Sequence, residues 1–291
     1  MTATPPVLSI ILVNWNTRDL LRACLRSLAA HPATGLTEII VVDNASADGS
    51  AEMLRSEFPA VTLIANDRNA GFAEGNNQGL ARAQGEFLLL LNPDTEVRPG
   101  ALDVLIVFLR AHPEAGAVAP RLEYPDGRLQ YSCRAFPWPG YLWAQGLGLA
   151  RLFPRSRTFG GYQMTWWAHD AAREVDQPMA SALLVRRAAY QAVGGFDPAF
   201  PIYFNDVDWC WRMRQAGWRI WYLPEAVVVH HLGASTRQMK AAMIAESHRG
   251  LLRFYAKHWR GRIGPFVYWP TVAGIALAGW ARTLFAMLRG R

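Results

Sequence analysis

The sequence predicts an α/β fold in which a mostly parallel central sheet is flanked by helices. Short apolar runs alternate with segments of helical periodicity through residues 7–119, which is the pattern of strands joined by crossover helices. A run of four leucines, Leu88 to Leu91, leads directly into Asn92-Pro93-Asp94. Such a run is typical of a buried strand, and Pro93 ends it because proline has no N–H to donate to a sheet. Asp94 is therefore expected at the carboxyl end of a strand, where open α/β sheets bind ligands.

Each element follows from its own pattern. Apolar and β-branched content predicts strands at residues 7–13, 39–42, 61–65, 87–91 and around 117–119. Apolar residues at helical spacing predict the intervening helices at 20–28, 50–58, 71–83 and 102–109. Further strands are expected at 182–185, 220–223 and 227–229, and further helices at 188–193 and 209–215. Because strands joined by crossover helices run parallel, their carboxyl ends should lie at one edge of the sheet.

Composition narrows the range of partners. The chain has 291 residues and a net charge of +7, with three cysteines scattered singly. These cysteines predict neither a disulfide framework nor a zinc ribbon, and residues 1–6 lack the basic region of a signal peptide. Many basic residues lie late in the chain, which indicates an anionic partner there. Since no finger, knuckle or recognition-helix motif accompanies the charge, we expect a membrane surface and no nucleic acid.

The C-terminal tail differs from the rest of the chain. Residues 263–281 carry no charged side chain, which is close to the roughly 20 residues that span a bilayer. Prolines and glycines interrupt this run and arginines flank it, so we expect an interfacial helix with basic anchors. A core helix or a contact in a homo-oligomer is the alternative.

An aromatic-rich stretch at residues 130–175 interrupts the alternation. Tryptophan, tyrosine and phenylalanine crowd there among prolines and glycines, and Trp166 and Trp167 are adjacent. The stretch is either an irregular loop pinned by its aromatic side chains or a platform whose faces stack on sugars or lipid tails.

Polar residues follow four consecutive predicted strands. The four strand ends carry Asn14 and Asn16, Asp43 and Asn44, Asn69 and Gly71, and Asn92 and Asp94. One such end is ordinary turn chemistry, but four that meet at one edge predict a shared polar site. Neither GxGxxG nor GxxxxGK occurs at these strand ends, so a nucleotide's phosphate charge would be left to a metal ion.

Glycines recur at residues 71, 75 and 79 of an expected helix. This bare stripe lets either a ligand or a neighbouring strand approach the helix backbone closely.

A second acidic cluster, Asn205-Asp206-Val207-Asp208, opens another expected helix. The helix dipole stabilises carboxylates there, so these acids are either capping groups or part of a site. Aromatic neighbours on both sides favour a partly desolvated site. His230 and His231 end the last strand, and because strand side chains alternate, only one of them can face a ligand.

In their order and spacing these pieces resemble the inverting family 2 glycosyltransferases of the GT-A fold, particularly bacterial rhamnosyltransferase-like members. The resemblance covers about residues 7–240 and is carried by Ser9 to Asn16, Val41 to Ser50, Asn69 to Phe72, Gly75 to Asn77, Leu91 to Asp94, Gly194 to Asp197, Asn205 to Asp208, Pro224 to Ala226 and His230-His231. It implies a catalytic domain at residues 1–240, with a nucleotide-binding half near 7–125 and an acceptor-binding half near 126–240. A basic and apolar helical extension follows at 241–291.

The resemblance also implies roles. Asp43 would hold the base and ribose of a nucleotide-diphosphate sugar. Asp94 and His230 would bind Mn²⁺ or Mg²⁺, and Asp206 would be the general base, with Asp208 as the second candidate. The other expected substrate-binding residues, including the two tryptophans of the aromatic stretch, are Asn14, Asn16, Asn44, Asn69, Gly71, Asn76, Asn92, Trp166, Trp167 and Asn205.

The chain departs from the family pattern twice. It carries Asn92-Pro93-Asp94 where many relatives carry Asp-x-Asp, and Asn205-Asp206 where many carry Glu-Asp. The second departure leaves the choice of base open between the two acids of the cluster.

The expected function is therefore metal-dependent transfer of a sugar, rhamnose among the candidates, to a hydroxyl of a cell-surface or lipid-linked glycan. The donor would be dTDP-rhamnose, a UDP-sugar or a GDP-sugar, and the enzyme would be cytoplasmic and peripheral on the inner face of the cell membrane. The alternatives are a sugar-nucleotide-binding protein that has lost catalysis and a scaffold for polysaccharide assembly. A nucleotidyltransferase is disfavoured because Asn14-Trp15-Asn16 stands where its glycine-rich loop would be.

Overall fold

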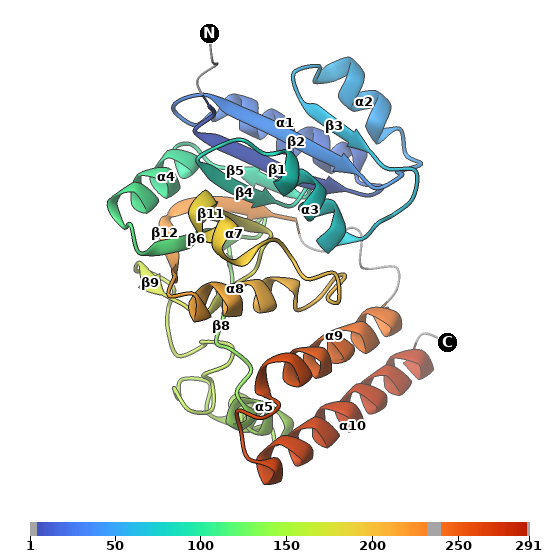
Figure 1. Ribbon diagram of the computed structural model, residues 1–291. Helices are drawn as coiled ribbons and strands as arrows, with labels where there is room; N and C mark the ends of the chain where they lie inside the picture. The colour runs from blue at the N-terminus through green and yellow to red at the C-terminus, as the bar shows by residue number, and fades with distance from the viewer. Residues whose placement is uncertain (1–4, 232–239, 290–291) are drawn as a thin grey trace.

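A ten-stranded sheet forms the centre of the computed structural model, which describes residues 5–231 and 240–289. Figure 1 shows helices flanking this sheet and two C-terminal helices at the end of the molecule remote from the N-terminus. The strands lie in the order β3-β2-β1-β4-β11-β6-β12-β5, with β7 paired to β6 and β9 paired to β12. The predicted α/β fold, with a central sheet between helices, is confirmed.

The first four strands of the chain are parallel, as the alternation of strands and helices predicts. β1 is central, and its register with β2 sets Asn14 beside Asp43. The elements of this part are β1 Leu8–Asn14, α1 Arg18–Ala30, β2 Thr37–Asp43, α2 Ser50–Glu57, β3 Thr62–Ala65, α3 Phe72–Arg82 and β4 Phe87–Leu91. Each lies within a few residues of its predicted range.

The second part of the sheet is mixed. β11 runs antiparallel between β4 and β6, and β12 runs parallel to β6, so β12 ends at the same edge as β1, β2 and β4. The strands expected at 220–223 and 227–229 are one strand with a register shift between Leu223 and Val227. The elements are β5 Thr95–Val97, α4 Ala101–Ala111, β6 Ala115–Glu123, β11 Ala182–Arg186, α7 Arg187–Val193, α8 Asn205–Gln215 and β12 Arg219–His230.

The aromatic-rich stretch is pinned to the core. This stretch and the residues next to it contain the short elements β7 Leu129–Gln130, β8 Cys133–Arg134, α5 Pro139–Gly146, α6 Leu149–Leu152, β9 Arg173–Glu174 and β10 Gln177–Pro178. Phe136 and Trp167 are buried in the main apolar cluster, and Phe136 meets Trp211 of α8 edge to face at 4.8 Å between centroids. Buried aromatic side chains thus hold this segment where long regular elements are missing.

The glycines of α3 let the helix pack against β1. A Cβ on Gly75 would stand 2.8 Å from Val13 Cγ1, and one on Gly79 would stand 2.4 Å from Ile11 Cγ2. Helix packing therefore accounts for both glycines, and it fixes the start of α3 close to the end of β1.

The C-terminal segment is partly integrated into the core. It comprises α9 Lys240–Phe254, a π-helical turn Tyr255–Trp259 and α10 Pro265–Arg289. Phe254, Tyr255 and Trp259 are at most 2% exposed and pack in the same cluster as α8. The predicted domain boundary at residue 240 adjoins residues 232–239, which lie outside the described residues. α10 is long and apolar enough to cross a membrane, and only 17% of its most apolar window is buried.

Candidate functional site

Asn14 and Asp43 meet where β1 and β2 end. The Asn14 amide donates to Asp43 Oδ1 at 2.8 Å and to Ser46 Oγ at 3.1 Å, while Thr17 donates to Asn14 Oδ1 at 2.7 Å. The Ser46 backbone N–H donates to Asp43 Oδ2 at 3.0 Å. Because Asn14 and Asp43 are at most 2% exposed, this network holds both strand ends in one fixed arrangement.

Two residues with left-handed backbone shape the turns beside this pair. Asn16 has φ 52° and Ala45 has φ 57°. Asn16 Oδ1 accepts the Ala47 N–H at 2.8 Å, and the Asn16 N–H donates to Ser46 Oγ at 2.9 Å. Such a conformation costs about 1–3 kcal/mol at a non-glycine residue and clusters at functional sites. The cost at Ala45 has no side-chain hydrogen bond to offset it, since alanine cannot form one.

Asn44 and Asn69 shape the loop before α3. Asn44 Nδ2 donates to Gly71 O at 3.1 Å, and Asn44 Oδ1 accepts from Asn66 at 2.8 Å. The Gly71 N–H donates to Asn69 Oδ1 at 2.9 Å, and Gly71 has φ +88°. A pocket of about 340 Å³ lies between this loop, α3 and residues 198–201. These amides therefore hold one wall of the pocket.

Two of the predicted substrate-binding amides are instead used by the fold. Asn76 is 2% exposed and donates to Phe72 O at 2.8 Å, one turn earlier in α3. Asn205 is also 2% exposed; its Nδ2 donates to Ile202 O at 2.8 Å, and its Oδ1 accepts the Asp206 N–H at 2.7 Å. Asn205 thus supports the loop that presents Asp206, and neither amide is open to a ligand.

The Asn92-Pro93-Asp94 strand end and the acidic helix meet across residues 180–181. The Asn92 N–H donates to Ser181 O at 2.9 Å, and the Ala180 N–H lies 3.4 Å from Asp206 Oδ2. The start of α8 therefore lies at the sheet edge that also carries Asn14, Asp43 and Asn92.

Asp206 has the surroundings of a proton acceptor. It is half-buried, and its Oδ1 accepts the Val207 N–H at 2.9 Å in the first turn of α8. Burial raises the pKa of Asp206, and the backbone hydrogen bonds from Val207 and Ala180 offset this only in part. A carboxylate with a raised pKa takes a proton more readily than an ordinary one.

Asp94 and His230 form a pair that fits a divalent cation. His230 Nε2 lies 3.3 Å from Asp94 Oδ1, and His230 Nδ1 lies 2.8 Å from Gln130 Oε1. With Nδ1–H donated to Gln130, the Nε2 lone pair faces the carboxylate, as in histidines that bind metals. No group of three or more His, Cys, Asp or Glu gathers in the described part of the chain.

The His231 side chain faces a different partner, as the alternation of strand side chains predicts. Its Nε2 lies 2.7 Å from Glu96 Oε1, while its backbone N–H donates to the Asp94 carbonyl at 2.9 Å. Of the two imidazole rings, that of His230 is therefore the one beside the Asp94 carboxylate.

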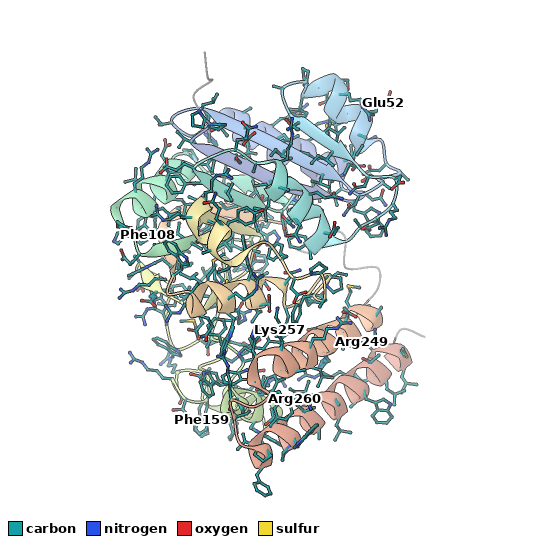
Figure 2. The ribbon with its side chains drawn as sticks, in the orientation of Figure 1. Glu52, Phe108, Phe159, Arg249, Lys257 and Arg260 are labelled. Carbon is teal, nitrogen blue, oxygen red and sulfur yellow. The ribbon has the colours of Figure 1, made fainter. Side chains whose placement is uncertain are left out.

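Asp208, the second candidate base, anchors the C-terminal segment. Its Oδ1 lies 2.7 Å from Lys257 Nζ and 2.7 Å from His258 Nε2, and its Oδ2 lies 2.8 Å from Arg212 Nε. Figure 2 shows Lys257 between α8 and the C-terminal helices. Burial by itself would raise the pKa of Asp208, but hydrogen bonds from His258, Lys257 and Arg212 outweigh it and lower the pKa to about 2. Since this carboxylate is fully buried and held ionised, it is poorly suited to accept a proton.

Replacing Asp208 with asparagine is expected to lower the free energy of unfolding by about 3 kcal/mol, because a fully buried carboxylate loses its ion pairs with Arg212 and Lys257, which are 20% and 34% exposed. Urea unfolding measures this loss. The depressed pKa of Asp208 stabilises the fold above the unfolded pKa of about 4, and this contribution disappears as the pH falls toward 2. Stability of the variant should therefore change less over that interval. Asp197, which binds Lys257 at 2.6 Å but is 28% exposed, is the control; equal small losses in both variants would contradict the anchor.

The aromatic pair at 166–167 is covered by other protein groups. Trp167 is 6% exposed and stacks on His169 at 4.0 Å between centroids. Arg157 and Arg173 lie over the Trp166 ring at 4.7 and 4.9 Å. The open stacking platform expected of these two residues is therefore not present, because their faces already serve packing and cation–π contacts.

Several residues that complete the site were not singled out from the sequence. Ser46 joins the first two strand ends, Gln130 orients His230, and Arg68 lines the pocket beside α3. A polar residue beside a strand-end motif is a signal that could have found Ser46. No local pattern marks Gln130 or His258, which bind partners 100 and 50 positions away.

Sequence comparison finds relatives that cover more than nine-tenths of the chain. The family model described as glycosyl transferase family 2 matches residues 9–166. The N-acetylglucosaminyl-diphospho-decaprenol L-rhamnosyltransferase of Mycobacterium tuberculosis is 28% identical over 98% of this chain and 95% of its own length. The O-antigen biosynthesis protein RfbC of Myxococcus xanthus is 29% identical over 91% of this chain and 20% of its own length.

Structural comparison finds the same fold. The mannosyltransferase PcManGT of Pyrobaculum calidifontis, in complex with GDP-Man and Mn²⁺, matches with a TM-score of 0.61 and 20% identity. The match covers 99% of this chain and 75% of that one. The likeness identifies the fold as GT-A.

Proposed function

Since the chain belongs to glycosyl transferase family 2, we propose that it is an inverting enzyme that transfers rhamnose from dTDP-rhamnose to a lipid-linked glycan. The observation that carries this proposal is that the strand ends bearing Asp43 and Asp94 and the start of α8 bearing Asp206 lie at one edge of the sheet. The relative that covers almost the whole chain acts, by its name, on a lipid-linked N-acetylglucosaminyl diphosphate. We therefore propose an acceptor of that class.

The donor nucleotide would lie over the first two strand ends. Asp43 and Asn14 are held there by their mutual hydrogen bond and by Ser46, so the strand ends are already in place when the nucleotide binds. The loop of Asn44, Asn69 and Gly71 would form the adjacent wall. Arg68 lines the pocket beside this loop, so its positive charge could bind a phosphate of the donor.

Asp206 would act as the general base in a single displacement. Its carboxylate takes the proton of the acceptor hydroxyl while that oxygen forms a bond to the sugar's anomeric carbon. The bond from that carbon to the nucleotide diphosphate breaks in the same step, and the diphosphate leaves with the electron pair. Attack from the face opposite the leaving group inverts the anomeric centre.

Asp94 and His230 would hold the divalent ion. When bound, the ion would offset the charge that develops on the departing diphosphate. Oxygen ligands suit both Mn²⁺ and Mg²⁺, whereas the nitrogen ligand of His230 favours Mn²⁺. Gln130 keeps the His230 ring in the orientation that turns Nε2 toward Asp94.

A lipid-linked acceptor implies work at a membrane. We propose that the enzyme is peripheral on the cytoplasmic face, where nucleotide sugars are available, with the apolar α10 as the contact.

A transfer assay tests the proposed function. The purified chain is incubated with Mn²⁺, a short-chain prenyl-diphosphate N-acetylglucosamine and, in turn, dTDP-rhamnose, UDP-sugars and GDP-sugars, and products are weighed by mass spectrometry. The proposal requires a product heavier by one deoxyhexose from dTDP-rhamnose. Transfer from a UDP- or GDP-sugar but not from dTDP-rhamnose would show that the proposed donor is wrong. Nucleotide binding without transfer or hydrolysis of any donor would show that the chain is a binding protein and not an enzyme.

A further inference from the structure

We propose that the outer side of α10, with the neighbouring corner formed by α5 and α6, docks flat onto an anionic lipid bilayer. Figure 1 shows α10 as the outermost element, with α5 beside its first turns. The outer stripe, as we name it, consists of Phe266, Trp269, Leu277, Trp280, Leu284 and Leu288. This surface is separate from the strand-end site.

The outer stripe is apolar along the whole helix. Its residues follow each other at helical spacing on one side of α10, and their exposure ranges from 41% at Leu284 to 94% at Phe266. Residues 263–281 carry no charge. A contiguous exposed apolar surface of this kind marks a contact site for a partner or a membrane.

The opposite side of α10 is committed to the protein. Tyr268, Thr271 and Ile275 are at most 7% exposed. Trp143 of α5 donates to Thr271 Oγ1 at 3.1 Å, and a Cβ on Gly279 would stand 2.8 Å from the His248 Cβ of α9. A helix held along one side in this way can lie in the interface but cannot cross the bilayer without leaving its neighbours.

α9 adds a second reason against a crossing. It lies along α10 and carries an exposed ion-pair cluster, in which Glu246 binds Arg249 at 3.4 Å and Arg253 at 2.5 Å. Charged side chains are costly at the bilayer centre, so the pair of helices is suited to the surface and not to the hydrocarbon core.

The corner between α5 and α6 lies next to α10 and carries further exposed apolar side chains. Leu147, Leu152 and Phe153 are 68%, 71% and 52% exposed, and Arg151 and Arg155 are exposed among them. Apolar side chains beside arginines are typical of segments that insert at the headgroup boundary.

Charge selects lipid as the occupant over a second copy of the chain. The sequence has no acidic residue between Asp126 and Asp170 and none after Glu246. The exposed Arg260 lies at the turn before α10 (Figure 2). Two copies meeting through this face would bring arginines together without a partner, whereas an anionic headgroup layer gains about 1 kcal/mol for each Lys or Arg near it.

Docking of this kind would also set the distance of Asp206 from the membrane surface. A Cβ on Gly250 of α9 would stand 3.1 Å from Tyr203 O, and this loop leads into Asp206. One helix layer, about 10 Å thick, therefore separates α10 from the loop that presents Asp206. This consequence rests on the proposed function, because it brings Asp206 to the height of a sugar on a lipid diphosphate.

Vesicle co-sedimentation of the full chain tests the docking. The chain should pellet with phosphatidylglycerol vesicles and at least tenfold less with phosphatidylcholine vesicles. The double variant Trp269→Glu/Trp280→Glu should lose at least tenfold in affinity for the anionic vesicles. Val107→Glu is the matched control, since Val107 is an exposed apolar residue, 63% exposed, on α4 and away from this face. Unchanged thermal unfolding without vesicles shows that each variant is folded.

A second pair of substitutions separates the contribution of the arginines to vesicle binding from that of the outer stripe. Arg151→Glu/Arg155→Glu should weaken binding to anionic vesicles and leave the weak binding to neutral ones unchanged. The docking is refuted if the tryptophan variant sediments like the wild type. It is also refuted if the wild type does not bind vesicles and is a dimer, while the tryptophan variant is a monomer. No donor or acceptor enters this experiment, so its result is independent of the proposed transfer reaction.

Discussion

The Asp206→Asn variant is expected to bind the donor normally and to lose about 10²–10⁴ in kcat, the usual contribution of a general base. The amide has nearly the size of the carboxylate but cannot take a proton. Donor KM should change little, because the Asn14–Asp43 pair at the first two strand ends is untouched. Steady-state kinetics over donor concentration separate the two parameters.

The pH profile gives the same prediction a second readout. Burial raises the pKa of Asp206, and a base must be ionised to act. The kcat of the wild type should therefore fall on the acid side at a higher pH than an ordinary Asp, of pKa about 3.9, would give. The residual activity of the variant should lack this limb.

Asp176→Asn is the matched control for the Asp206 variant. Burial also raises the pKa of Asp176, and its Oδ2 accepts the Phe136 N–H at 2.8 Å within the aromatic stretch. Its variant should keep kcat within a few-fold. Near-normal turnover by Asp206→Asn, combined with total loss in folded Asp208→Asn, would transfer the role of base to Asp208.

Asp94→Ala is expected to abolish metal-dependent turnover, because the pair with His230 loses its only carboxylate. Two protein ligands hold a divalent ion weakly, so Mn²⁺ binding to the wild type should be strong only when a nucleotide diphosphate is present. Titration of Mn²⁺ followed by electron paramagnetic resonance, with and without dTDP, measures this without any turnover.

The neighbouring histidine supplies the control for the metal site. His231→Gln removes a ring that contacts Glu96 at 2.7 Å, so it should leave Mn²⁺ binding and activity unchanged. Full activity of the wild type in excess chelator, or dTDP-dependent Mn²⁺ binding by Asp94→Ala equal to that of the wild type, would refute the assignment of Asp94 and His230.

The strand ends could be predicted because their signals are local. A leucine run that stops at Pro93 predicts both the strand and its end, where Asp94 follows. The helices between β1, β2 and β4 predict that these strands are parallel. The same holds for Asp43, whereas the choice of His230 over His231 came from the family resemblance and not from a local signal. At both strand ends the residue's neighbours in sequence are also its structural context.

Other features depend on contacts that the sequence does not mark. The choice between Asp206 and Asp208 turns on Lys257 and His258, which reach Asp208 from another part of the chain. From the sequence, Trp167 is a candidate for stacking on a sugar, but in the structure His169 and Tyr222 pack against its ring. The late basic charge predicted an anionic partner, yet part of it serves internal ion pairs such as that of Lys257.

The anomeric configuration of the product tests the central claim most directly, namely that Asp206 activates an acceptor hydroxyl for one direct displacement. Nuclear magnetic resonance of the new glycosidic linkage, formed from a donor of known configuration, gives this result in one experiment. We expect the product to have the anomeric configuration opposite to that of the donor. Retention of the donor's configuration would require either two displacements or attack from the face of the leaving group, and it would contradict the role given to Asp206.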